Sequence, residues 1–317
     1  SREKKPLTLG DAFQQYIDDA KSNSNGIRIV PNTLKTFTNS LSHIKYLRMH
    51  AILLSELDMD WYYEFVERSE QSGRNGALLS LNYISTHVKK IKRVMRYAED
   101  NGHTVNSSYR STSFKAPQET ASEIYLNEEE LRKIRELELS AEQYSLALTR
   151  DLFMIGAYSG LRVSDYNRLT NDNLNSHNGS EMIEVRCQKT NSVVVIPLHQ
   201  VAKDILNNYS GGLPPTQNEQ VMNRNLKALG ELAGIYEEVV IETTRGGRMA
   251  AYKKPKHEMI KTHTARRSFC TNAYLSGVDT LDIMALSGHT TETSFLKYIK
   301  VTGKERAKRI AEHKFFQ

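Results

Sequence analysis

Six side chains in the second half of this 317-residue chain have the types needed for chemistry on a phosphodiester. A tyrosine hydroxyl can attack phosphorus and hold it covalently, and an arginine guanidinium offers a planar fork of donors that matches two phosphate oxygens. The six are Arg162 in SGLRVSDYNRL, Lys189 in CQKTNSVVVIPL, His263 and Arg266 in HTARRSF, and His289 and Tyr298 in LSGHTTETSFLKYIK. Because neither a carboxylate cage nor a phosphate-cradling glycine loop accompanies them, the set predicts covalent cleavage of a DNA strand.

The nine-residue interval between His289 and Tyr298 constrains the backbone between them. In one continuous α-helix, nine residues correspond to about 180° around the axis and roughly 13 Å along it. The two side chains could not then reach one phosphate, so a break is required. We expect one helix to end at Gly288 and another to begin at a threonine cap, Thr290 or Thr291. This spacing selects Tyr298 among the 16 tyrosines of the chain.

Arg162 lies two residues after Gly160, at the expected joint between two helices. Glycine permits the tight turn that brings a nearby side chain into a cleft. The alternative is a surface arginine that caps a helix. Asp165, three residues further on, is a candidate to hold the Arg162 guanidinium in place, and its alternative role is that of a first-turn helix acid.

Lys189 falls in a turn between two β-rich runs, residues 182–188 and 192–198. A hairpin tip of this kind can insert a lysine into a DNA groove. His263 and Arg266 stand three residues apart at the start of a helix and therefore share a face. Arg266 is expected to be the second phosphate clamp. His263 either accepts the tyrosine proton or bonds a phosphate oxygen, and the sequence leaves both roles open.

The order Arg, Lys, His-x-x-Arg, His, Tyr resembles the tyrosine recombinase (phage integrase) family. The resemblance covers about residues 120–317 through specific motifs and residues 7–118 in general character. The stretch THTARRSFCTNAYLSG and the hairpin before it are most similar to integrases of mobile elements in Bacteroides-type bacteria.

The resemblance implies that all six residues are catalytic. Tyr298 would form a 3′-phosphotyrosyl link, while Lys189 would protonate the departing 5′ oxygen. It also implies two domains that close as a C-shaped clamp on double-stranded DNA, and a homo-oligomer, a tetramer, on that DNA. Accessory DNA-bending proteins are further partners that the resemblance allows. Because the phosphotyrosine stores the bond energy, no cofactor is expected, neither ATP nor a divalent metal.

Composition sets broader bounds. A hydrophobic content of 39% and a charged content of 25% fit a soluble globular protein. The sequence has no membrane-length apolar run, and its start, SREKKPLTLG, is not expected to be a signal peptide. Two widely spaced cysteines, Cys187 and Cys270, suit a reducing cytoplasm, where we expect the protein to act on nucleoid DNA. The histidines and cysteines lack metal-ligand spacing, and no nucleotide-binding fingerprint is present. The net charge of +6 permits nucleic-acid binding without proving it.

Two domains are expected: a helical, SAM-like core DNA-binding domain at residues 1–118 and the catalytic domain at residues 119–317. The second should be mainly α with small β-hairpins, so the fold class is α+β. In the first domain, apolar spacing predicts helices near residues 8–20, 34–47, 57–65 and 84–98. The fourth pairs a buried apolar stripe with cations of one sign, which favour phosphate contact over a merely solvated face. These cations are Lys89, Lys92, Arg93 and Arg96.

Three further segments carry functional predictions. Residues 101–123 lack periodicity and are interpreted as an interdomain linker, with Arg110 and Lys115 suited to a DNA backbone. The pattern of residues 236–253 predicts a second hairpin. Its Arg245 and Arg248 either contact DNA or only keep the surface soluble. Residues 304–317 form a short amphipathic helix that ends in two phenylalanines and docks on this subunit or on a neighbour. The abrupt start suggests that an N-terminal arm-binding domain has been removed, or that the enzyme is naturally short.

Three alternatives remain at this stage. A type IB topoisomerase uses the same residue types as a monomer. A chromosome-dimer or inversion recombinase differs only in its DNA sites. A non-enzymatic DNA-binding factor would keep the basic helices and lose catalytic residues, and here every member of the catalytic order is present.

Overall fold

The computed structural model describes residues 5–24, 26, 28–73, 78–119, 122–301, 303–311 and 316. Contacts divide the chain into two compact units. The first unit holds Ser1–Ala121 together with Ile241–Tyr252, and the second holds Ser122–Val240 and Lys253–Gln317. The sequence-based boundary after residue 118 assigned residues 241–252 to the second domain, whereas they group with the first unit.

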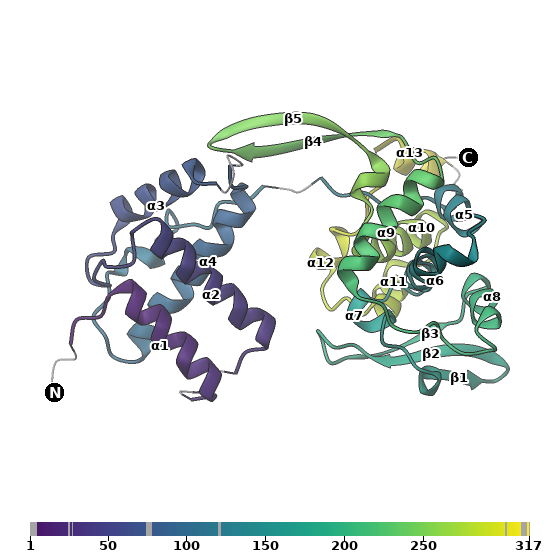
Figure 1. The fold of residues 1–317 in the computed structure, drawn as a ribbon, viewed down its shortest axis with the longest axis horizontal. Helices are drawn as coiled ribbons and strands as arrows, with labels where there is room; N and C mark the ends of the chain where they lie inside the picture. Colours follow the sequence, from purple (N-terminus) through teal and green to yellow (C-terminus); the bar gives the residue numbers. More distant parts are fainter. Residues whose placement is uncertain are drawn as a thin grey trace. The chain divides into compact units, whose positions relative to one another are not determined.

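Four helices form the body of the first unit: α1 (Leu9–Ser22), α2 (Pro31–Tyr46), α3 (Met59–Gln71) and α4 (Leu81–Asp100) (Figure 1). Their starts follow the capping rules. Thr8, Asp58 and Ser80 each accept a backbone N–H of the first turn of α1, α3 and α4, and Pro31 opens α2. All four helices were expected, and the apolar stripe of α4 is fully buried, from Ile84 through Val88 and Ile91 to Ala98.

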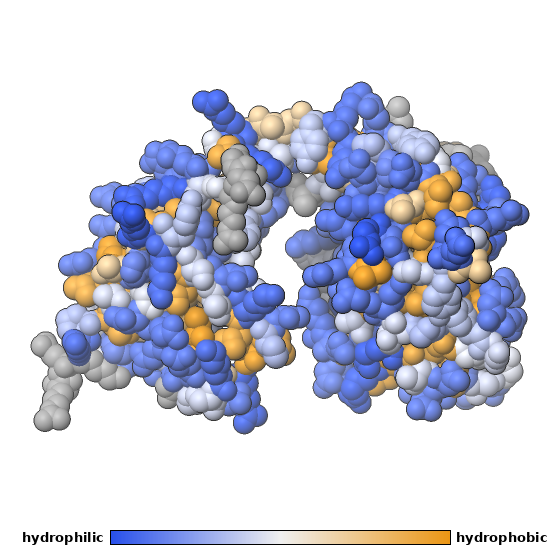
Figure 2. Space-filling view, in the orientation of Figure 1, coloured by the Kyte–Doolittle hydropathy of each residue, from blue (hydrophilic) through white to orange (hydrophobic). Residues whose placement is uncertain are grey.

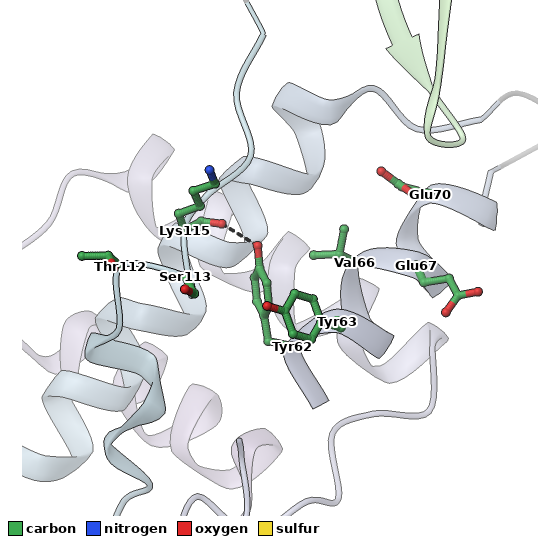
Figure 3. Close-up of a pocket in the computed structure, with 8 residues that line it drawn as sticks. All are labelled: Tyr62, Tyr63, Val66, Glu67, Glu70, Thr112, Ser113 and Lys115. Atoms are coloured by element: carbon green, nitrogen blue, oxygen red, sulfur yellow. Dashed lines mark hydrogen bonds between the residues drawn. The ribbon is translucent and has the colours of Figure 1, made fainter. Parts of the chain in front are cut away.

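Residues 103–117 pack onto this helical body. They include a 3₁₀ turn (Ser107–Arg110), and the side chains of Tyr109 and Phe114 lie in the same hydrophobic core as α4. The Tyr62 hydroxyl donates to the Lys115 carbonyl over 2.7 Å (Figure 3). The prediction of a linker is therefore wrong for this stretch, because two aromatic anchors hold it without any helical period.

A long hairpin explains why residues 241–252 group with the first unit. It consists of β4 (Glu238–Arg245) and β5 (Arg248–Pro255), and it confirms the hairpin expected at residues 236–253. Gly246 and Gly247 form its turn. Arg245 forms a β-bridge with Ser80, and the Thr243 hydroxyl donates to the Glu119 carboxylate. A side chain at Gly246 would lie 2.7 Å from Leu78, so glycine permits this close seating.

The second unit is mainly helical and carries a small antiparallel sheet in the order β1 (Leu174–His177), β2 (Ser180–Arg186), β3 (Val193–Pro197). The hairpin β2–β3 was expected, and its register pairs Val185 with Val194 and Ile183 with Ile196. Strand β1 was not expected, because three of its four residues are exposed and it has no apolar alternation.

Helix α6 (Tyr144–Ser159) runs through the core of the second unit and is buried from Leu148 almost to its end. Around it lie α5 (Glu128–Arg135), α7 (Val163–Tyr166), α8 (Gln200–Asn208), α9 (Glu219–Leu232), α10 (Thr262–Leu275), α11 (Thr280–Ser287), α12 (Glu292–Leu296) and α13 (Gly303–Ala311). Short 3₁₀ turns occupy Ala141–Gln143, Asn171–Asn173 and Lys256–Met259. Helix α5 begins with a reciprocal capping box between Asn127 and Glu130.

The architecture confirms the predicted fold class, mainly α with small antiparallel hairpins. Figure 2 shows a face on which hydrophilic residues predominate and hydrophobic residues occur in scattered patches. Among the described residues, no helix has the length and apolar character needed to cross a membrane.

Candidate active site

Helix α10 and the segment after α12 bring His263 and Tyr298 into contact. The Nε2 atom of His263 lies 2.7 Å from the Tyr298 hydroxyl oxygen. Burial, followed by the charges of Arg267 and Arg266, lowers the pKa of His263 from 6.5 to about 4. The imidazole is therefore neutral near pH 7 and can accept the hydroxyl proton. Of the two roles that the sequence left open for His263, this geometry favours proton acceptance from Tyr298.

Arg266 is almost completely buried and ties three catalytic segments together. Its Nη1 atom donates to the carbonyl oxygens of Gly160 and Ser287, and its Nη2 atom lies 3.0 Å from Nε2 of His289. The guanidinium carbon also stands 5.3 Å from the centre of the Tyr298 ring. Arg266 thus fixes the position of its neighbours as well as supplying charge.

The hydrogen bonds around His289 define its tautomer. The Ser287 hydroxyl donates to the Ile283 carbonyl over 2.6 Å, so it accepts at 2.7 Å from Nδ1–H of His289. Nε2 of His289 then carries the lone pair that faces Arg266. Burial, together with the charges of Arg266 and Arg162, lowers the pKa of His289 to about 3, so the ring is neutral. The ring centres of His289 and Tyr298 are 4.6 Å apart.

The helix break between His289 and Tyr298 is present where the sequence predicted it. Helix α11 ends at Ser287, and Gly288 follows in the left-handed region with φ of 65°. Helix α12 begins after Thr291, whose hydroxyl accepts the backbone N–H of Ser294. The two side chains meet because the chain turns between these short helices.

Arg162 is the N-terminal cap residue of α7, and the preceding Gly160 ends α6 with φ of 71°. Its Nη1 atom is buried and has no hydrogen-bond partner among the described residues. Burial and the nearby charge of Arg162 lower the pKa of Arg266, which places the two guanidinium groups within each other's field. An anion would relieve both the unpaired donor and the repulsion.

The expected contact between the Asp165 carboxylate and the Arg162 guanidinium does not form. The fully buried Asp165 carboxylate instead accepts the backbone N–H of Gln188 over 2.9 Å and pairs with Arg168 at 3.4 Å. The reason is that a buried carboxylate is stabilised by several donors, and the β2–β3 turn presents one directly to it. Asp165 therefore contacts the turn that carries Lys189.

Lys189 is exposed in the turn between β2 and β3. Its side chain forms no hydrogen bond or ion pair within the part of the chain that is described. The structure thus gathers His263, Arg266, His289 and Tyr298 by direct contact, with Arg162 nearby through its charge. Lys189 reaches outward from an adjoining turn.

The cations predicted to contact DNA lie in the first unit. Lys92, Arg93, Arg96 and Arg110 line a pocket of about 420 Å³ together with Tyr109. Lys92 donates to the Phe114 carbonyl over 2.8 Å, and Arg110 is paired with Glu99. Lys89 and Lys115 are exposed outside this pocket, Arg245 lines a different pocket beside α2, and Arg248 is exposed on β5.

Two residues beside the site were missed from the sequence. Ser287 sets the tautomer of His289, and Arg168 joins Asp165 to the Arg186 carbonyl. A serine before Gly288 carries no distinct sequence signal, and Arg168 looks like an ordinary surface arginine. Among the described residues, no group of three His, Cys, Asp or Glu side chains could hold a metal ion.

The fold and the site belong to the class of DNA strand-exchange enzymes that use a tyrosine. Residues 125–305 match the phage integrase family, and residues 8–116 match the phage integrase SAM-like domain. The first match covers more than half of the chain, so the chain belongs to the phage integrase family. It is a site-specific tyrosine recombinase, an enzyme that cleaves and rejoins DNA.

Solved structures share this fold at low sequence identity. A lambda integrase dimer bound to a COC′ core site superposes with a TM-score of 0.66 at 16% identity, over 93% of this chain and 77% of that one. The Tn1549 transposon integrase in complex with circular intermediate DNA has a TM-score of 0.62 at 16% identity, and the match covers 95% of this chain and 99% of that one. The XerH recombinase bound to a palindromic difH substrate has a TM-score of 0.61 at 15% identity, and the match covers 95% of this chain and 83% of that one. No curated protein sequence matches the chain.

Proposed function

We propose that this recombinase integrates or excises a mobile DNA element, with Tyr298 as its nucleophile. The observation that carries the assignment is the 2.7 Å contact between the Tyr298 hydroxyl and a neutral His263. Ordinary tyrosine ionises near pH 10, so attack at neutral pH needs a base at the hydroxyl. His263 occupies that position, and the proton of Tyr298 moves to its Nε2 atom as the oxygen attacks phosphorus.

Arg162 and Arg266 stabilise the charge that develops on the phosphorane. The buried, unpartnered Nη1 atom of Arg162 supports a bound phosphate oxygen as its partner. Arg266 already donates to two carbonyls and faces His289, so its contribution is charge and alignment of the site. Lys189 protonates the departing 5′ oxygen from its exposed turn, because an alkoxide is a poor leaving group.

Double-stranded DNA is the proposed partner, bound by both units. The support in the first unit is the pocket of four cations, among which Arg110 is paired with Glu99. Neutralising phosphates with such cations releases counterions and makes binding salt-dependent. Among the solved structures with this fold is a lambda integrase tetramer bound to a Holliday junction. By analogy, we propose that this chain also assembles as a tetramer on paired sites.

The mobile-element role rests on two kinds of likeness. The motif THTARRSFCTNAYLSG resembles integrases of Bacteroides-type mobile elements by its sequence alone, and the Tn1549 neighbour is a transposon integrase. Action on nucleoid DNA in the bacterial cytoplasm belongs to the same proposal. A chromosome-dimer or inversion role would differ in the DNA sites used, which sequencing of genomic junctions distinguishes.

A suicide DNA substrate that traps the covalent intermediate tests the chemistry. The wild-type protein should form a protein–DNA adduct, and Tyr298→Phe should form none at unchanged DNA affinity, because only the nucleophilic oxygen is lost. Tyr144→Phe is the matched control, since Tyr144 is an exposed tyrosine at the start of α6. An adduct that persists in Tyr298→Phe would overturn the assignment.

A further inference from the structure

Helix α7 carries catalytic Arg162 at one end and the contacts of the Lys189 turn at the other. Arg162 caps its N-terminus, and the Arg162 carbonyl accepts the backbone N–H groups of Asp165 and Tyr166. Asp165 lies on the helix and Arg168 follows two residues after its end. Helix α7 therefore connects Arg162 to the turn that carries Lys189.

Arg168 and Asp165 each form one hydrogen bond with the chain directly before Lys189. Its Nη2 atom pairs with Oδ1 of Asp165 at 3.4 Å and also donates to the carbonyl of Arg186. The same Asp165 oxygen accepts the backbone N–H of Gln188 at 2.9 Å. Arg186 and Gln188 flank Cys187, directly before Lys189, so the chain is held on both sides of one residue.

Beyond these bonds, the turn is closed by its own backbone. Cys187 is fully buried, its N–H donates to the Ser192 carbonyl over 2.8 Å, and its carbonyl accepts from Asn191 over 2.9 Å. Lys189 itself is exposed, and its side chain makes no hydrogen bond or ion pair within the described ranges. The placement of its ammonium therefore depends on how firmly the turn is anchored.

We propose that Arg168, acting with Asp165, is a positioning residue that holds Lys189 in place for leaving-group protonation. Arg168 neutralises the buried Asp165 carboxylate and fixes the Arg186 carbonyl at the same time. Without it, Asp165 keeps the Gln188 N–H as a donor but loses its ion-pair partner. The turn then loosens, and the lysine loses its alignment with the 5′ oxygen. The inference rests on the proposed general-acid role of Lys189.

A leaving group that needs no proton separates positioning from general structural damage. Arg168→Ala should slow single-turnover cleavage of a normal suicide substrate by about tenfold to a hundredfold, the scale of a misplaced catalytic group. With a 5′-phosphorothiolate at the scissile position, the sulfur departs without protonation, and the rate should return to within about threefold of wild type. Arg168→Lys should be partly active, because an ammonium can still pair with Asp165.

Three controls make each outcome decisive. Arg168→Ala leaves the buried Asp165 carboxylate without its ion pair, so thermal melting checks that the variant is folded at the assay temperature. Arg132→Ala, an exposed arginine paired on α5, should leave both rates unchanged. Lys189→Ala should be rescued by the sulfur substrate.

The proposal is wrong if Arg168→Ala cleaves both substrates slowly while the 5′-phosphorothiolate restores cleavage by Lys189→Ala. It is also wrong if Arg168→Ala cleaves the normal substrate as fast as wild type. It also falls if Arg168→Ala weakens DNA binding in gel shifts by as much as it slows cleavage, since Arg168 would then be a DNA anchor. Failure of the sulfur substrate to rescue Lys189→Ala would overturn the general-acid role first, and the positioning role with it.

Discussion

At the scale of single residues, the protonation of His263 controls whether Tyr298 can be activated. Burial and the charges of three arginines destabilise the imidazolium, and the pKa of His263 is lowered to about 4. An ordinary histidine side chain would be half protonated at about pH 6.5 and would lose its capacity as a base there. The protein instead keeps the base available in mildly acidic solution.

The pH profile of cleavage tests this arrangement. The second-order cleavage rate at limiting protein concentration reports ionisations of the free protein. Its acid limb should have a midpoint far below 6.5, towards about 4. A midpoint near 6.5 in a protein that remains folded would contradict the buried, neutral base.

The free energy of unfolding should also decrease as the pH falls. The folded pKa of His263 is depressed, so the unfolded chain takes up its proton at a higher pH. The stabilising contribution is complete above about pH 6.5 and is lost progressively as the pH falls towards about 4. His289 acts with the same sign, since its pKa is lowered to about 3. Thermal melts at each pH therefore accompany the rate measurements and define the range in which the profile reports catalysis.

The residue types and their order in the chain were enough to predict which side chains meet around Tyr298, because each stands beside a distinctive backbone signal. The partner of Asp165 could not be predicted in this way. A spacing of three residues made Arg162 a candidate, but the Gln188 N–H that binds Asp165 lies 23 residues away in the sequence. Contacts of that separation depend on how the β2–β3 hairpin packs on α7, which local periodicity does not encode.

At the scale of secondary structure elements, Gly288 lets α11 end so that His289 and Tyr298 share one site. Its φ of 65° is costly for a residue with a side chain, and an added Cβ would lie 3.3 Å from Val194. Gly277 provides a matched control, since its φ of 91° carries the same backbone restriction with no neighbouring atom within 4 Å.

Both Gly288→Ala and Gly277→Ala should lose about 1 to 2 kcal/mol of stability through the left-handed backbone alone. Gly288→Ala should in addition slow cleavage at least tenfold, because His289 shifts relative to Arg266 and Tyr298. Denaturant unfolding and single-turnover rates measure the two effects. Equal rates for the two variants would show that the helix break tolerates displacement of His289.

The hairpin β4–β5 shows the limit of sequence reasoning at this scale. Its strands and its Gly246-Gly247 turn follow from alternation and turn chemistry. Its grouping with the first unit depends on two contacts, the bridge between Ser80 and Arg245 and the hydrogen bond between Glu119 and Thr243. In both contacts, the partner in the first unit lies more than one hundred residues before the strand in the sequence. A sequence-based boundary assumes contiguous domains, and this chain crosses between units more than once.

At the scale of the whole molecule, the C-terminal segment is the element with two possible docking partners. Helix α13 contacts its own unit through a hydrogen bond of 2.8 Å from the Tyr125 hydroxyl to Glu305. Phe315 lies outside the described residues, and 62% of Phe316 is exposed. A phenylalanine side chain gains about 1.5 to 3 kcal/mol when it is fully buried, so coverage by a neighbouring subunit would favour assembly.

Deleting residues 304–317 should therefore leave a protein that binds one DNA site and fails to pair two. Phe316→Ala should weaken pairing in the same direction, because it removes apolar surface that is mostly exposed on this subunit. Tyr125→Phe is the matched comparison: it removes the bond to Glu305 within the subunit and leaves the terminal phenylalanines intact. Native gel shifts with one-site and two-site DNA measure both steps. Two outcomes would contradict docking on a neighbouring subunit: unchanged pairing after the deletion, or equal destabilisation of the isolated protein by Tyr125→Phe and by the deletion in thermal melts. In either case the C-terminal segment docks on its own subunit.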